Sequence, residues 1–126
     1  MIRRSALVAF WLLVAAITFV TLSPIQFRPR TGHAVLERFG AFFALGAAFM
    51  TAYPKRLPTA VGVVSLIAVA LEAMQRLVPS RHGEVLDALE KLAGGLAGVA
   101  VAALAFGLSE RFRRDGRPTA GDESAP

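Results

Sequence analysis

Four long apolar stretches fill most of this 126-residue chain, which is 55% apolar. They run approximately over 5–22, 34–53, 57–78 and 85–108. A helix of about 20 residues crosses the roughly 30 Å hydrocarbon core of a bilayer. The sequence therefore predicts an all-α, four-helix transmembrane bundle with little chain left over for a soluble domain.

Five of the ionisable side chains inside the last three stretches stand out. They are Glu37 and Arg38 at the start of the second, Glu72 near the end of the third, and Asp87 and Lys91 at the start of the fourth. Because successive spans run in opposite directions, these three ends share one membrane face. A charge near the hydrocarbon core is costly, so each of the five is a candidate functional residue.

Basic residues are concentrated at the other face. They are Arg3, Arg4, Lys55, Arg56, Arg111, Arg113, Arg114 and Arg117, against Arg28, Arg30 and Arg81 in the loops on the first face. Cytoplasmic loops of membrane proteins are enriched in Lys and Arg, so we expect cytoplasmic termini and extracytoplasmic charges. The net charge of +5 thus reflects topology, and no nucleic-acid partner is expected.

The N-terminal and C-terminal segments each carry a sequence signal of their own. Met-Ile-Arg-Arg before an apolar run resembles a secretory signal, but 5–22 is long and no small-residue cleavage pattern follows, so we expect a retained helix. Residues 110–126 are basic and then small and polar, which predicts a disordered cytoplasmic tail after a membrane domain over 1–109. Cysteine is absent, which excludes disulfides and thiol chemistry.

Small residues recur at helical spacing in the last three stretches, on the faces that carry the charges. Such stripes let helix backbones approach closely in a membrane. We expect helix packing at Gly40, Gly62, Gly94 and Gly98, the last two spaced as Gly-x-x-x-Gly.

Glu72 and Gln75 share a helix face, since they lie three residues apart. At that depth a carboxylate needs a cation, and Arg38, Arg81 and Lys91 are candidates. Asp87 and Lys91 have the i to i+4 spacing, acid first, that allows a pair within one helix.

The polar cluster predicted at this face consists of Glu37, Arg38, Glu72, Gln75, Arg81, Asp87 and Lys91. One interpretation is that buried ion pairs only fix the helices against one another. The other is a pocket for an anionic or polar headgroup, to which Arg81 would add a bidentate cation.

Other chemistry is poorly supported. His33 and His82 lack tight metal-ligand spacing, and no nucleophile elbow surrounds Ser80. Gly94, Gly95 and Gly98 lie inside a hydrophobic stretch, not in a phosphate-binding loop. We therefore expect neither a metal nor a cofactor, and no catalytic residue can be assigned.

The polar residues resemble the signature of VanZ-like bacterial membrane proteins. That signature has Glu-x-x-Gln, a short loop with arginine, and Asp-x-x-x-Asn-x-x-Gly-x-x-x-Gly; here Glu72 to Gln75, Arg81, and Asp87 to Gly98 match it. The segment 37–46 also resembles the family's second helix, and the resemblance covers roughly 20–107. Lys91 departs from the pattern, because it stands where the family usually has asparagine.

The resemblance implies a multi-pass protein of the bacterial cell membrane with a role in the cell envelope. The family's namesake is associated with low-level resistance to teicoplanin, without an assigned mechanism. Expected partners are membrane lipids, an anionic envelope ligand or another membrane protein.

Three functions stay open from the sequence. The first is a VanZ-like envelope protein that presents the polar cluster as a ligand site. The second is a membrane enzyme for a lipid-linked phosphate or cell-wall precursor, in which Arg81 and Lys91 hold the anion and Glu72 or Asp87 is the general acid or base. The third is an interaction subunit whose face at Gly94 and Gly98 docks onto another membrane complex.

Cysteine accessibility tests the orientation. We expect an impermeant thiol reagent to label Ser80→Cys in intact cells and to leave Thr59→Cys unlabelled, because Ser80 is in the third loop and Thr59 is near the opposite face. The chain has no native cysteine, so the parent protein is the blank. Labelling of Thr59→Cys alone would reverse the predicted topology.

Overall fold

The computed structural model describes residues 1–22, 34–77 and 85–116, and all regular secondary structure in these ranges is α-helical. The helices are α1 (Ile2–Leu22), α2 (Ala34–Ala52), α3 (Leu57–Arg76) and α4 (Val85–Asp115). Each is long enough and apolar enough to cross a membrane. The predicted all-α, four-helix architecture is confirmed, and the chain has the make-up of a multi-pass membrane protein.

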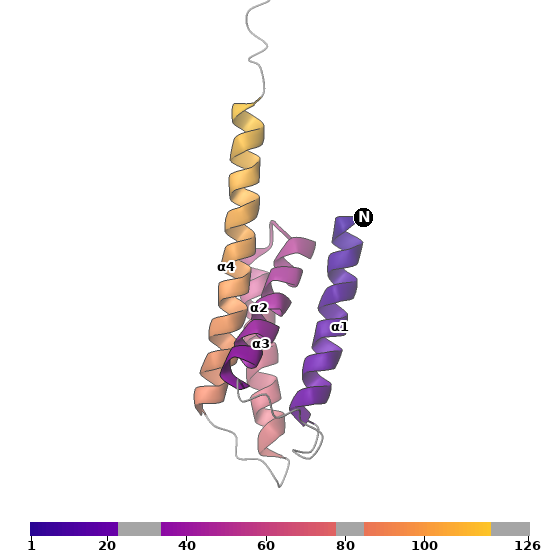
Figure 1. Cartoon of the computed structure of the whole chain (residues 1–126), viewed down its shortest axis with the longest axis vertical. Helices are drawn as coiled ribbons and strands as arrows, with labels where there is room; N and C mark the ends of the chain where they lie inside the picture. Colours follow the sequence, from indigo (N-terminus) through magenta and orange to yellow (C-terminus); the bar gives the residue numbers. More distant parts are fainter. Residues whose placement is uncertain (23–33, 78–84, 117–126) are drawn as a thin grey trace, which may run out of the picture.

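The short link between α2 and α3 has clear local causes. The amide of Tyr53 donates to the Phe49 carbonyl at 2.9 Å, and the next residue, Pro54, has no amide hydrogen to continue the ladder. Pro58 lies in the first turn of α3, where an amide hydrogen would have no partner within the helix. α2 and α3 contact one another and run antiparallel (Figure 1).

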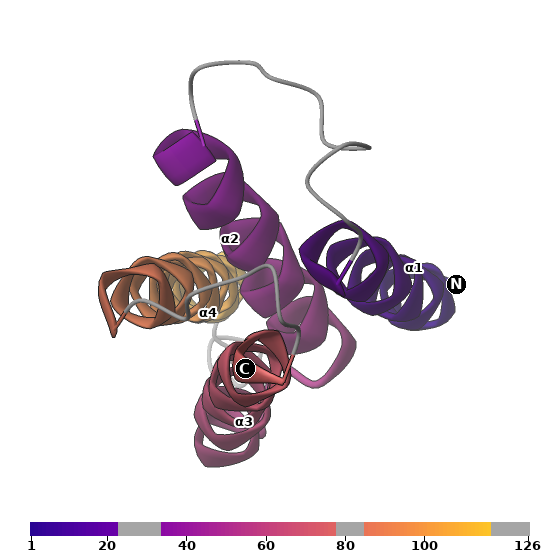
Figure 2. The ribbon, with the colours of Figure 1, turned by 90° about the horizontal axis from the view of Figure 1, so that it is seen from below.

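α2 is the central helix. It contacts all three others, most extensively α4, and Figure 2 shows α1 and α4 on its opposite sides. The core between the helices is apolar, and its most deeply buried side chains include Phe42, Leu45, Val64 and Val99. Large apolar side chains also cover the outer surface, as lipid contact requires.

Glycines bring the backbones of α2 and α4 into direct contact. A β-carbon added to Gly94 or Gly98 would overlap the carbonyl oxygen of Phe39 or Phe43 in α2. A β-carbon added to Gly46 would overlap the carbonyl oxygen of Gly95. These contacts leave no space for a side chain, so glycine is required for the observed helix separation.

Gly40 and Gly62 do not serve the packing role that was expected of them. A β-carbon at either would meet no atom within 4 Å. The small-residue face of α2 that contacts α4 carries Gly46. α3 packs against α4 through Val64, because a β-carbon added to Gly95 would overlap the Val64 side chain. Spacing in the sequence shows which residues share a helix face, but the rotation of each helix about its axis decides which face contacts a neighbour.

α4 is longer than expected. Its 31 residues correspond to about 46 Å of helix, and it extends past the N-terminal end of α1 in Figure 1. The expectation of disorder from residue 110 is therefore wrong for residues 110–115, where Glu and Arg favour helix. The amide of Gly116 still donates to the Phe112 carbonyl at 3.1 Å, and residues 117–126 lie outside the described ranges.

The glycine contacts predict that an added methyl group destabilises the bundle at one glycine of α4 and not at another. We expect Gly98→Ala to destabilise the bundle by about 1–3 kcal/mol, because the new β-carbon overlaps the α2 backbone. Gly107→Ala is the matched control on the same helix, since no atom lies within 4 Å of its added β-carbon. Thermal unfolding in detergent measures both, and equal melting temperatures would contradict the close contact.

Candidate functional site

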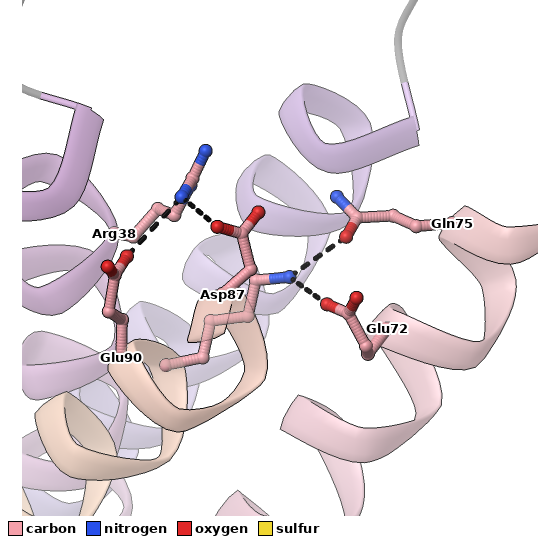
Figure 3. A network of polar contacts seen from close by, with 6 residues as sticks. Arg38, Glu72, Gln75, Asp87 and Glu90 are labelled. Atoms are coloured by element: carbon pink, nitrogen blue, oxygen red, sulfur yellow. Dashed lines mark hydrogen bonds and ion pairs between the residues drawn. The ribbon is translucent and has the colours of Figure 1, made fainter. Parts of the chain in front are cut away.

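The start of α2, the end of α3 and the start of α4 lie at one end of the bundle (Figure 1). Six polar side chains meet there in two groups, which we call the polar network (Figure 3). They are Arg38, Glu72, Gln75, Asp87, Glu90 and Lys91. Five of these six belong to the polar cluster predicted from sequence.

The first group holds a buried ammonium between α3 and α4. Lys91 Nζ donates to Glu72 Oε2 and to Gln75 Oε1, each at 3.1 Å. Lys91 is only 2% exposed, and both acceptors are buried as well. Glu72 and Gln75 lie nearly one turn apart on α3, which places both acceptors before the same ammonium.

The second group joins α2 to α4. Arg38 Nη1 donates to Asp87 Oδ1 at 2.5 Å and to Glu90 Oε2 at 3.3 Å. About a fifth of each side chain is exposed. Asp87 and Glu90 are three residues apart, so both carboxylates present to α2 from one face of α4.

The pair expected between Asp87 and Lys91 within α4 is replaced by contacts between helices. Asp87 pairs with Arg38 of α2, and Lys91 pairs with Glu72 of α3. Two acceptors on a neighbouring helix satisfy a buried ammonium better than a single carboxylate on the same helix does. Of the two described cations considered for Glu72, Arg38 and Lys91, it is Lys91 that pairs with it.

Glu90 is a functional candidate that the sequence analysis missed. Its side chain is 18% exposed and shares Arg38 with Asp87. The signal was present, because Glu90 follows Asp87 at the i to i+3 spacing of one helix face.

Two residues of the predicted polar cluster, Glu37 and Arg81, are not among the six of the polar network. Glu37 is exposed in the first turn of α2, next to Arg38. Arg81 lies outside the described residues, as do His33, Ser80 and His82.

Glu72 has an unused acceptor inside this network. Oε1 is buried, and no donor among the described residues reaches it, whereas Oε2 accepts from Lys91. Leaving a buried polar atom without a partner costs about 1–3 kcal/mol, and more for a charged group. Among the described residues, Glu72 Oε1 is therefore a buried acceptor without a donor.

Comparisons with protein-family models, with curated proteins and with solved structures find no match.

The buried pair predicts strong coupling between two residues. We expect Glu72→Met to lower the free energy of unfolding by about 3–5 kcal/mol, because it leaves the Lys91 ammonium buried without its carboxylate partner. The double variant Glu72→Met/Lys91→Met should recover most of that loss, since apolar groups of similar volume then replace the pair. Folded yield and melting temperature in detergent measure the cycle, and additive losses would contradict the pairing.

Proposed function

We propose that the chain is a VanZ-like protein of the bacterial cell membrane that binds a polar envelope ligand at the polar network. The observation that carries this proposal is the group formed by Lys91, Glu72 and Gln75. Glu72 and Gln75 form the Glu-x-x-Gln pattern of the resemblance, whereas Lys91 stands within the second matching segment at the position where the family usually has asparagine. Their convergence on one buried centre is what a shared functional site would require.

Binding explains the network better than helix registration alone. α2 and α4 are already held by backbone contacts at Gly46, Gly94 and Gly98, and α3 packs against α4 where Val64 meets Gly95. A buried ion pair adds little stability over apolar residues of the same size, because desolvation offsets the attraction. Registration also gives no reason for the unused oxygen on Glu72.

The charge of the opposite end supports an extracytoplasmic location for the network. The described residues near that end include Arg3, Arg4, Lys55, Arg56, Arg111, Arg113 and Arg114. The guanidinium carbons of Arg3 and Arg56 lie 5.0 and 6.0 Å from the centre of the Tyr53 ring. An excess of arginine and lysine is typical of the cytoplasmic side, whereas tyrosine is common at both membrane interfaces.

The other two functions gain no specific support. The enzyme hypothesis needs Lys91 to hold an anion, and its ammonium is engaged by Glu72 and Gln75. The docking hypothesis needs a free face at Gly94 and Gly98, and α2 occupies that face.

Ligand retention tests the proposal directly. We expect protein purified from bacterial membranes in mild detergent to carry an envelope lipid or lipid-linked precursor that Glu72→Met/Lys91→Met loses by about tenfold, which is the effect of about 1.4 kcal/mol. Mass spectrometry of co-purified small molecules gives the readout. Ser109→Ala, an exposed position far along α4, is the control. Identical retention by the parent and the double variant would leave the network with a structural role only.

A further inference from the structure

We infer that the group recognised by this site is a hydrogen-bond donor on a neutral lipid headgroup, with Glu72 Oε1 as its acceptor. The inference rests on the proposed function and names its ligand class. It replaces the anionic ligand expected from sequence with one of opposite hydrogen-bonding character.

Both cations of the network are already committed to protein acceptors. Lys91 donates to a carboxylate and an amide oxygen, and Arg38 donates to two carboxylates. An incoming phosphate or carboxylate that took these particular N–H groups would have to displace the acceptors. The displaced carboxylates would then lose their own partners in a partly or wholly buried place.

The charge of the network also disfavours an anion. Arg38 and Lys91 are opposed by three carboxylates, those of Glu72, Asp87 and Glu90. The group thus carries a formal excess of one negative charge. Charges interact strongly where little water screens them, so a neutral headgroup that offers an N–H or O–H fits better.

The unsatisfied atom defines the required chemistry. Glu72 is 6% exposed, and its Oε1 is the buried side-chain atom that lacks a partner within the described residues. An ionised carboxylate oxygen only accepts hydrogen bonds, so its complement must donate.

The position of the acceptor near the end of α3 favours a lipid headgroup as the donor's source. Glu72 lies four residues before the end of α3, or about 6 Å of helix from that end. The ends of membrane-spanning helices approach the headgroup region, because the hydrocarbon core is only about 30 Å thick. Phosphatidylethanolamine combines a neutral headgroup with ammonium donors, and phosphatidylcholine is the matched lipid in which methyl groups replace those hydrogens.

Competition between these two lipids is the test. The full chain in detergent is mixed with equal amounts of both lipids of identical acyl composition, and bound lipid is counted by native mass spectrometry. We expect about tenfold more phosphatidylethanolamine than phosphatidylcholine on the parent protein, the effect of one hydrogen bond to a charged group. Glu72→Met/Lys91→Met should show no preference, and Ser109→Ala should keep it.

The outcomes separate this inference from the proposed function. Equal binding of the two lipids, with an envelope component still retained only by the parent protein, would overturn the donor inference and leave the proposed function standing. Preference for phosphatidylglycerol in a parallel mixture would also overturn it, in favour of an anionic ligand. Equal binding together with unchanged retention by the double variant would overturn both.

Discussion

The contact between the backbones of α2 and α4 is the constraint on which the rest of the bundle depends. Gly94 lies against Phe39, the residue that follows Arg38, and it is one turn after Glu90. Once these backbones touch, Arg38 is held within reach of carboxylates on α4. The ion pairs therefore follow from the glycine contact more than they cause it, which fits the small energy of partly exposed pairs.

α3 joins α4 in a different way. Val64 packs near Gly95, and two turns further along α3, Glu72 reaches Lys91. One contact is apolar and fills space, whereas the other buries an ammonium that must keep its acceptors. The polar contact is thus more sensitive to substitution than the apolar one, because loss of one partner leaves a buried charge without a counter-ion.

The sequence predicted the helices and their shared polar end because both depend on local properties. Apolar length sets the spans, and alternation of direction places Arg38, Glu72 and Lys91 at one face. Pairing depends on helix rotation, which periodicity does not determine. For this reason the spacing of Asp87 and Lys91 suggested a pair within α4, and Gly40 and Gly62 suggested contacts where the structure has open space. Glu90 was overlooked although its spacing to Asp87 was informative.

The two ends of the bundle use charge in opposite ways. At the basic end, most charged side chains are exposed, and Arg3 and Arg56 flank the Tyr53 ring. Such charges suit a membrane surface, where water screens them and anionic headgroups attract them. At the polar network, charge is turned inward and almost fully matched within the protein. The exception is Glu72 Oε1, a buried acceptor that receives no hydrogen bond from the described residues. An internal network with one open acceptor favours a donor, whereas a basic surface is selective only for charge. The function we propose therefore places ligand recognition at the polar network and membrane anchoring at the basic end.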